Sequence, residues 1–428
     1  MMEGKWRVLP EMMEDALPVL KQLNSYGFEA VFVGGCVRDT IMGLAIHDVD
    51  MATAALPEQV MEIFPGSIPT GLQHGTVTVR FQDELYEVTT FRTESEYEQH
   101  RRPAGVRFIA SLEGDLLRRD LTINAMALMA DGKLYDPFGG QQDIQGRWIR
   151  CVGDADARFQ EDALRMLRAV RFAAKFDYSF SYRTWKALRS HHHLLRHIAM
   201  ERVMAELNQM IEGPRPAAAM KLLSASCLLQ HAAKPLPALM AIQTNPRWDR
   251  LAELRHGLRW AALFVYCGAT TDQIETTMDS LRFPGRLNTS VMAVISMHLR
   301  MKAALDVAPN DKEQQQPIRK EWTSCVLEHG AGAAADWLEI LVMEASYPAI
   351  AMTFRQWLEE MPATTLKQLK LDGHALAQGV NRQPGSWMGI MMKRLLFAVG
   401  MKELPNEPEQ LLEQAKLWIT EDRINDNE

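Results

Sequence analysis

A pair of glycines, an arginine and two spaced aspartates form the first cluster of residues that suits chemistry on phosphates. They are Gly34, Gly35, Arg38, Asp48 and Asp50. Neither glycine has a Cβ, so the backbone there can approach a phosphate closely. The arginine can donate paired hydrogen bonds to phosphate oxygens. Because residues i and i+2 of an extended segment share a face, the two aspartates present neighbouring carboxylates, which suit Mg²⁺ that also binds substrate phosphates. Two aspartates alone would be more simply a solvated strand end, but the glycines and the arginine favour the phosphate interpretation.

A second charged cluster, Arg118, Arg119 and Asp120, precedes an apolar stretch that runs to Met129. Taken alone, it fits the charged start of a helix, with the aspartate near the positive end of the helix dipole. This cluster therefore gains a functional meaning only together with the others.

A third cluster consists of four charged residues that recur at every third position, namely Asp162, Arg165, Arg168 and Arg171. Residues three apart are neighbours on a helix surface. A solvated helix face is the usual meaning of such a run. Three arginines with one acid, however, make a poor ladder of ion pairs, and they favour a platform for a nucleotide.

The elements that must position these residues are predicted from hydrophobic periodicity. In the first 150 residues we expect a helix at 12–24, strands at 29–33 and 48–53, a β-hairpin of 76–81 with 85–91, a mobile loop at 92–112 and a turn at 135–140. Helical patterns then follow at 159–176, 183–194, 200–212, 216–229 and on to about 303. A polar stretch at 308–320 is the expected linker to further helices. The pattern predicts an α+β protein, with a small mixed sheet in the head and an all-α remainder.

The composition is ordinary for a soluble globular chain of 428 residues, with 47% hydrophobic and 24% charged residues. No apolar run approaches the about 20 residues that span a bilayer, and residues 1–10 lack the apolar core of a signal peptide. We therefore expect no membrane partner. The five cysteines are widely scattered, which excludes a disulfide scaffold and indicates a reducing compartment, the cytoplasm.

The net charge of −7 argues at first against a nucleic-acid partner. The charge is uneven, however, because residues 147–202 hold 12 Lys and Arg against 6 Asp and Glu, a local net charge of +6. Residues 403–428 hold 2 bases against 8 acids, a local net charge of −6. A local basic surface is sufficient for binding nucleic acid, so the overall sign does not exclude it.

Taken together, the three clusters resemble the class II tRNA nucleotidyltransferases, the CCA-adding enzymes of the DNA polymerase beta superfamily. The matching blocks stand in the family's order: Gly34–Asp39 with the two aspartates, Arg118–Asp120, the turn Tyr135–Gly140, and Glu161–Phe172. The likeness continues through residues 201–207, and residues 384–389 and 404–407 resemble the tail of the bacillus-type enzymes. It therefore covers nearly the whole chain.

The resemblance implies four parts of the chain. A polymerase-beta-like catalytic head would occupy residues 1–150, and a helical neck with the nucleotide-selecting helix would occupy 151–215. A helical body would occupy 216–305, and a helical tRNA-binding tail would occupy 320–428.

The resemblance also implies a role for each site residue. Asp48 and Asp50 would bind the catalytic Mg²⁺. Three residues would hold the triphosphate and sugar, namely Gly35, Arg38 and Arg119. Asp162 and Arg165 would recognise the base, and the nucleotide pocket would be completed by Arg168 and Arg171. Glu87, in the second strand of the predicted hairpin, is our candidate for a third catalytic carboxylate, with a surface cross-strand partner as the alternative.

Chemistry supports the assignment of the base-reading pair independently. Cytosine and adenine each present an amine donor beside a ring-nitrogen acceptor, whereas uracil and guanine present a carbonyl beside an N–H donor. A carboxylate only accepts and a guanidinium only donates. The pair Asp162 and Arg165 therefore fits C and A and leaves U and G with unpaired polar groups, at a cost of roughly 1–3 kcal/mol each.

The expected reaction is attack of the tRNA 3′-hydroxyl on the α-phosphate of CTP or ATP, with release of pyrophosphate. Three alternatives stay open. A bacterial poly(A) polymerase shares the head motifs but usually has a strongly basic C-terminal extension, and this tail is acidic. A partial enzyme would add only CC or only A; the CC-adding type has a shortened loop, whereas residues 92–112 look full length. A tRNA-binding regulatory protein without activity is the third, and a homodimer also remains open.

Overall fold

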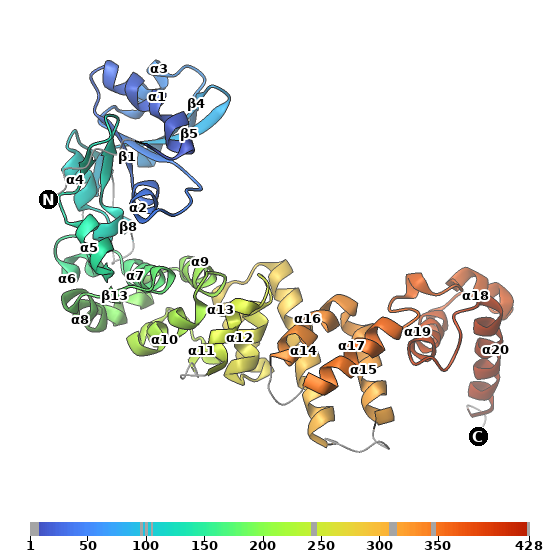
Figure 1. Cartoon of the computed structure of the whole chain (residues 1–428). Helices are drawn as coiled ribbons and strands as arrows, with labels where there is room; N and C mark the ends of the chain where they lie inside the picture. The colour runs from blue at the N-terminus through green and yellow to red at the C-terminus, as the bar shows by residue number, and fades with distance from the viewer. Residues whose placement is uncertain are drawn as a thin grey trace. The chain divides into compact units, whose positions relative to one another are not determined.

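The computed structural model describes residues 8–94, 97–98, 102–103, 106–240, 246–307, 315–343 and 348–425 (Figure 1). The chain forms two compact units. The first comprises Met1–Asn245 with Glu275–Arg282, and the second comprises Pro246–Ile274 with Phe283–Glu428. The predicted α+β class is confirmed, because the main sheet lies at the N-terminal end and helices make up the remainder.

The first unit contains a mixed seven-stranded sheet, in the blue to teal part of Figure 1. Its strands stand in the order β11-β10-β1-β2-β5-β4-β3. Their bounds are β1 Ala30–Val33, β2 Asp50–Thr53, β3 Ile68–Gly71, β4 Thr76–Phe81, β5 Glu84–Thr90, β10 Ala127–Met129 and β11 Leu134–Tyr135. Strands β2 and β5 run parallel, and every other neighbouring pair in this sheet is antiparallel. The parallel pair places the two strands that carry candidate site residues side by side.

The helices of the first unit follow from amphipathic patterns. In α1, for example, Met13, Leu20 and Leu23 are buried, and this apolar side packs toward β1. The helices are α1 Glu11–Ser25, α2 Gly35–Met42, α3 Pro57–Ile63, α4 Leu112–Leu117, α5 Gly140–Gly146, α6 Ala155–Glu161, α7 Leu164–Phe176, α8 Tyr182–His191, α9 Met200–Ile211, α10 Pro216–Ser226 and α11 Pro237–Met240. Short 3₁₀ helices add η1 Leu72–His74, η2 Thr122–Asn124, η3 His192–His197 and η4 Leu228–His231. Strands β12 Trp148–Ile149 and β13 Ser179–Phe180 pair in parallel beside α7.

The segment predicted as a loop at 92–112 contains regular structure, so that part of the prediction is wrong. Strand β6 Arg92–Glu94 pairs antiparallel with β9 Val106–Phe108, and β7 Tyr97–Glu98 pairs antiparallel with β8 Arg102–Pro103. Backbone pairing forms this ribbon although the side chains show no alternation of apolar and polar residues. The remaining residues between 94 and 106 lie outside the described part of the chain.

A second prediction is corrected at residues 159–176, where one continuous helix was expected. Helix α6 ends at Glu161 and α7 begins at Leu164. Asp162 between them has an extended backbone, with φ −136° and ψ 105°. Asp162 therefore does not share a helix face with the three arginines, which do lie on α7.

The second unit is helical. Its helices are α12 Arg259–Cys267, α14 Gly285–Val307, α15 Gln315–His329, α16 Ala331–Val342, α17 Pro348–Glu360, α18 Gly373–Gly379, α19 Ser386–Gly400 and α20 Pro408–Asn425, with η5 Pro246–Glu253 and η7 Leu366–Gln368. Helix α13 Thr271–Leu281 contributes its residues from Glu275 onward to the first unit. Helix α15 begins at Gln315, earlier than the expected resumption near 320, and residues 308–314 of the predicted linker lie outside the described residues.

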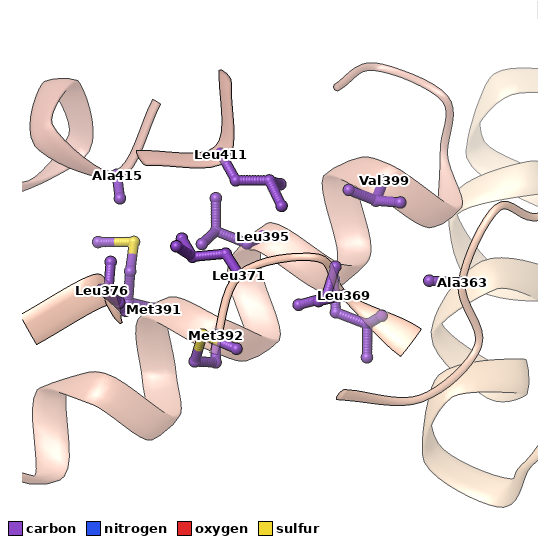
Figure 2. Close-up of a cluster of buried hydrophobic side chains, with 11 residues drawn as sticks. Ala363, Leu369, Leu371, Leu376, Met391, Met392, Leu395, Val399, Leu411 and Ala415 are labelled. Carbon is purple, nitrogen blue, oxygen red and sulfur yellow. The ribbon is translucent and has the colours of Figure 1, made fainter. Parts of the chain in front are cut away.

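The C-terminal helices have their own core. Figure 2 shows side chains of α18, α19 and α20 and of the segment before α18 meeting in one apolar cluster, with Leu376, Leu395 and Leu411 at 0% exposure. These residues come from elements up to about 50 positions apart in sequence, and Leu327 of α15 also packs against the cluster, so it belongs to the core of the second unit. Among the described residues, none of the helices combines the length and the apolar character needed to span a bilayer.

Candidate active site

Three carboxylates lie together at the start of β2. Asp50 is the first residue of this strand, and Asp48 precedes it by two positions. In the parallel register of β2 and β5, Asp50 stands opposite Glu87. Burial raises the pKa of Asp50, as do the negative charges of Asp48 and Glu87, whereas the nearby Arg119 lowers it. The structure thus brings the predicted third carboxylate to the two aspartates, and the shared negative charge favours a cation there.

The carboxylates fit a divalent ion whose remaining ligands are supplied by the substrate phosphates and water. Within the described residues, no group of three or more His, Cys, Asp or Glu side chains is arranged to hold a metal ion alone. Mg²⁺ is usually held by one or two carboxylates together with substrate phosphates and water. Asp48 and Asp50 supply that minimal pair, so these residues fit the predicted ion.

The glycine that the geometry requires beside these carboxylates is Gly34. Its φ is +73°, a backbone conformation that residues with a Cβ rarely adopt. A Cβ built there would lie 3.0 Å from Arg119 Nη1 and 3.6 Å from Asp50 Oδ2. A Cβ on Gly35 would lie 3.7 Å from Arg38 Nη2, an ordinary contact. The sequence analysis expected both glycines to let the backbone approach a phosphate but assigned only Gly35 to the triphosphate, whereas the positive φ and the close contacts are found at Gly34.

Arg38 is buried, with 5% exposure, and connects three elements. Its Nη1 donates to Asn124 Oδ1 of η2 at 2.6 Å, and its Nε and Nη2 donate to Asp39 at 2.8 and 2.9 Å. Its Cζ also lies 5.2 and 5.0 Å from the ring centres of Phe172 and Phe176 on α7. A guanidinium has five N–H donors. Three of these donors are used in the bonds to Asn124 and Asp39, so with respect to the described residues two N–H groups remain for a phosphate oxygen.

The cluster of Arg118, Arg119 and Asp120 does not begin an α-helix, because α4 ends at Leu117 and the cluster forms the turn before η2. Asp120 accepts from Arg168 Nε at 2.6 Å and from Asn124 Nδ2 at 3.2 Å. Burial alone would raise the pKa of Asp120, but Arg168 and these hydrogen bonds outweigh it and lower the pKa well below its ordinary value. The turn is therefore fixed to α7 by an ion pair between the buried Asp120 and the partly exposed Arg168.

The two predicted base-reading residues each have a partner. Asp162 Oδ2 accepts from Arg202 Nη2 of α9 at 2.7 Å, and Asp162 Oδ1 caps the backbone N–H of Leu164 at 3.0 Å. Arg165 Nη1 donates to Glu161 Oε2 at 2.7 Å, and its Nη2 donates to the Arg118 carbonyl at 2.9 Å. These bonds hold both side chains near the break between α6 and α7.

The next two arginines of α7 are anchored by Glu206 of α9. Arg171 Nε donates to Glu206 Oε2 at 2.7 Å, and Arg168 Nη1 lies 3.9 Å from Glu206 Oε1. The neighbouring Asp120 raises the pKa of Arg168, and burial lowers the pKa of Arg171. Glu206, itself 6% exposed, belongs to the segment that resembled the family, but sequence reasoning gave it no role.

Cys36 lies directly behind the carboxylates. Its thiol is 1% exposed and donates to the Val33 carbonyl at 3.2 Å and, more weakly, to the Asp50 carbonyl at 3.7 Å. Burial raises the pKa of this thiol to about 12. The cysteine is therefore a packing residue of the first loop rather than a nucleophile.

Comparison with known protein families agrees with this geometry. Residues 30–150 match the family described as "Poly A polymerase head domain". Residues 177–240 match the "Probable RNA and SrmB-binding site of polymerase A", and residues 255–415 match "tRNA nucleotidyltransferase domain 2". The first match contains the three carboxylates, Arg38 and Arg119.

Relatives extend the similarity to nearly the whole chain. The chain is 36% identical to a CCA-adding enzyme of Bacillus cereus (strain Q1), over 96% of this chain and 99% of the relative. It is 37% identical to the CCA-adding enzyme of Geobacillus thermodenitrificans, over 95% of this chain and 96% of the relative. The solved structure of the Bacillus stearothermophilus CCA-adding enzyme in complex with CTP matches with a TM-score of 0.81 and 31% identity, over 98% of this chain and 100% of that one. By sequence, fold and site, the chain thus belongs to the CCA-adding enzymes, the nucleotidyltransferases that add CCA to tRNA.

Proposed function

We propose that this enzyme adds and repairs the complete 3′-terminal CCA of tRNA, using CTP and ATP and releasing pyrophosphate. The observation that carries the proposal is the convergence of Asp48, Asp50 and Glu87 with Arg119 beside the Cβ-free Gly34. In the reaction, the bond between the tRNA 3′-oxygen and the α-phosphorus forms, and the bond from that phosphorus to the β-phosphate oxygen breaks.

The metal we propose is Mg²⁺, held by Asp48 and Asp50, within a family that uses a divalent ion. When bound, it would neutralise the phosphate charges and stabilise the attacking and leaving oxygens. Glu87 is proposed as the third carboxylate, because it faces Asp50 across the parallel strands. Its charge helps to bind the cation and to orient the 3′-hydroxyl.

The remaining assignments concern the nucleotide. Gly35, Arg38 and Arg119 are proposed to hold the triphosphate and sugar, and the two unused N–H groups of Arg38 are suited to this. Asp162 would accept the amine of C or A while Arg165 donates to the ring nitrogen. Arg168 and Arg171 would complete the pocket. The CTP complex of the Bacillus stearothermophilus relative supports CTP as a substrate.

The tRNA partner is supported by the names of the relatives and by the basic segment 147–202. We also propose the division into head 1–150, neck 151–215, body 216–305 and tail 320–428, which is finer than the two compact units. A homodimer and a cytoplasmic location stay predictions. Light scattering of the purified enzyme would test the first, and imaging of the tagged protein in cells would test the second.

The decisive experiment incubates the enzyme with Mg²⁺, tRNA that lacks its 3′ end, and each labelled nucleoside triphosphate singly and in pairs. We expect two C additions from CTP alone and one further A when ATP is also present. Only C or only A addition would indicate a partial enzyme, and a long A run on unrelated RNA would indicate a poly(A) polymerase. Binding of tRNA without any addition would indicate a regulatory protein.

A further inference from the structure

A buried aspartate next to the second charged cluster has no role in the assignments above. Asp115 lies on α4, between Leu112 and Leu116, and is 1% exposed. Residues three apart share a helix face, so Asp115 points the same way as Leu112. Leu112 and Leu116 are both buried. They pack into the core that contains Val33 and Phe91 of the sheet region. An ionised carboxylate in such a place is stable only when it is paired and hydrogen-bonded.

Its partners come from three directions. Asp115 Oδ1 accepts from the backbone N–H of Arg92 at 3.2 Å and from Arg118 Nε at 2.9 Å. Asp115 Oδ2 accepts from Arg119 Nη2 at 3.2 Å. Burial would raise the pKa of Asp115, but the two guanidinium groups and the Arg92 amide lower it overall. The carboxylate is therefore ionised at neutral pH and bridges two arginines and a strand.

The other end of Arg119 faces the catalytic carboxylates. Arg119 Nη1 donates to the Asn124 carbonyl at 3.4 Å and lies 3.0 Å from the position of a Cβ on Gly34. The same guanidinium lowers the pKa of Asp50. One guanidinium thus connects Asp115 on its Nη2 side with the metal-binding loop on its Nη1 side.

We infer that Asp115 is a positioning residue. It fixes the position of the Arg119 guanidinium next to Asp50 and links that position to Arg92, the first residue of β6. This inference rests on the proposed function, because it concerns how Arg119 meets the triphosphate. Arg92 begins the ribbon of β6 and β9, and its amide is bonded to Asp115. A shift of β6 and a shift of Arg119 are consequently coupled through one carboxylate. Because the CC-adding type has a shortened 92–112 segment, we expect A addition to depend on the ribbon of β6 and β9 and therefore on Asp115.

The test compares Asp115→Asn with a matched control, Asp143→Asn. Asparagine keeps the size of the side chain but loses the charge and one acceptor oxygen. Asp143 is also buried, at 4% exposure, and accepts from Thr122 Oγ1 at 2.7 Å and from Arg150 Nε at 3.0 Å. Asp143→Asn removes one aspartate–arginine pair and Asp115→Asn removes two, both in the same head, but only Asp115→Asn touches Arg119 and β6.

We expect Asp115→Asn to lower kcat/KM for A addition to tRNA ending in CC by about tenfold or more, which corresponds to one charged hydrogen bond. The kcat/KM for C addition should fall by less than about threefold. Asp143→Asn should change both steps in proportion. An equal loss of both steps in Asp115→Asn would overturn the inference. If the wild-type enzyme adds no CCA at all, the proposed function fails instead, so the two failures are distinguishable.

A double-mutant cycle separates positioning from simple loss of stability. If Asp115 acts through Arg119, then adding Asp115→Asn to Arg119→Ala should change A addition by less than about threefold further. If the losses of A addition in the two single variants multiply in the double variant, the two residues act independently, which contradicts the inference.

Because Asp115→Asn could impair folding, a second pair of variants tests the bond to β6 directly. Arg92→Ala keeps the backbone donor and Arg92→Pro removes it, at a strand start where proline is tolerated. We expect Arg92→Pro to lower the ratio of A to C addition below that of Arg92→Ala, and equal ratios would refute the tie to β6.

Discussion

The carboxylate of Asp162 is bonded to the guanidinium of Arg202, 40 residues further along the chain, with Oδ2 and Nη2 2.7 Å apart. Arg165, three residues after Asp162, bonds Glu161 on the preceding helix. Each candidate base reader therefore has a partner that fixes its direction before a nucleotide arrives. A carboxylate has about four acceptor sites, so the Arg202 bond leaves room for the amine of a base.

The base-reading hypothesis predicts that Asp162→Ala changes which nucleotide enters. Loss of the acceptor weakens the binding of C and A, and it removes the carboxylate that repels the carbonyl oxygen of U and G. UTP or GTP incorporation should rise relative to CTP by about one to two powers of ten, while CTP efficiency falls. Single-turnover incorporation of each triphosphate at fixed tRNA measures this ratio. Glu58→Gln, which changes an exposed carboxylate on α3, is the control and should leave the CTP:UTP ratio unchanged. An unchanged CTP:UTP ratio in Asp162→Ala would end the base-reading role.

The metal hypothesis predicts that Asp48→Ala and Asp50→Ala each lose nucleotide addition and still bind tRNA within several-fold of wild type. Removal of a main ligand should cost several kcal/mol of transition-state stabilisation, so less than about a tenth of the wild-type turnover should remain. Turnover assays and filter binding give the two values. Glu58→Gln, an exposed carboxylate on α3, serves as the control and should keep full activity. Retention of more than a tenth of turnover in either aspartate variant contradicts the assignment.

The basic segment 147–202 predicts that tRNA affinity falls steeply with salt despite the net charge of −7. Six of its 12 cations form ion pairs with described carboxylates, namely Arg150, Arg158, Arg165, Arg168, Arg171 and Arg202. Exposed Arg183 and Lys186 on α8 form no ion pair with a described residue and are the better candidates for binding phosphates.

When the logarithm of the tRNA-binding constant is plotted against the logarithm of the salt concentration, the double variant Arg183→Ala/Lys186→Ala should give a shallower slope than wild type. The slope should fall by about one for each phosphate that these two cations neutralise in the wild-type complex. Lys21→Ala, an exposed lysine on α1, is the matched control and should keep the wild-type slope. Affinity that does not change between low and moderate salt would remove the argument from the basic segment.

Shortening the 92–112 segment between its paired strands should leave CC addition largely intact and block the final A. The reason is its place between β5, which carries Glu87, and the turn that carries Arg119. Segments of this kind complete a pocket for one substrate while the chemistry stays unchanged. Product lengths on tRNA with no CCA and on tRNA ending in CC measure the two steps separately. Equal loss of both steps, or of neither, argues against a switching role.

The Asp120–Arg168 ion pair predicts a pH-dependent stability. Because the folded pKa of Asp120 is lowered, its contribution is fully present above the ordinary value of about 4 and is lost as the pH falls below it. Asp120→Asn should lower the free energy of unfolding at pH 7 by about 2 kcal/mol, less than a fully buried pair because Arg168 is 35% exposed.

Urea unfolding at pH 7 and at about pH 3 tests this, with the ordinary carboxyl pKa as the reference point. The difference between wild type and Asp120→Asn should shrink at the lower pH. Asp83→Asn, in the exposed hairpin turn, should match the wild type within about 0.5 kcal/mol at both values. A constant difference between wild type and Asp120→Asn would show that the charge of the carboxylate is not the cause.

Local patterns predicted the elements whose stability is local. The hairpin expected at 76–81 and 85–91 is present as β4 Thr76–Phe81 and β5 Glu84–Thr90, because alternation and the polar turn agree. Gln82 and Asp83 take the positive φ values of 50° and 67° that a tight turn needs. The helix expected at 12–24 is α1 Glu11–Ser25 for a similar reason.

What the sequence did not predict depends on distant partners. The break at Asp162 has no Gly or Pro to mark it, and the bond to Arg202 that accompanies it crosses 40 residues. Glu206 lies in a predicted helix and Asp115 follows a segment predicted as a loop, and only their burial among arginines distinguishes these two acids. The candidate site could thus be named from motifs, whereas the residues that hold it in shape required the tertiary structure.

The burial of Cys36 behind the candidate metal-binding carboxylates has a consequence for covalent labelling. Alkylating reagents react with thiolates, and a thiol that is 1% exposed with a pKa of about 12 offers almost none at neutral pH. Thiol oxidants should therefore leave the segment between β1 and α2 intact, while the half-buried Cys227 is more accessible. Slow alkylation of Cys36 would then occur only when β1 and α2 separate, and its rate would report how often this part of the head opens in solution.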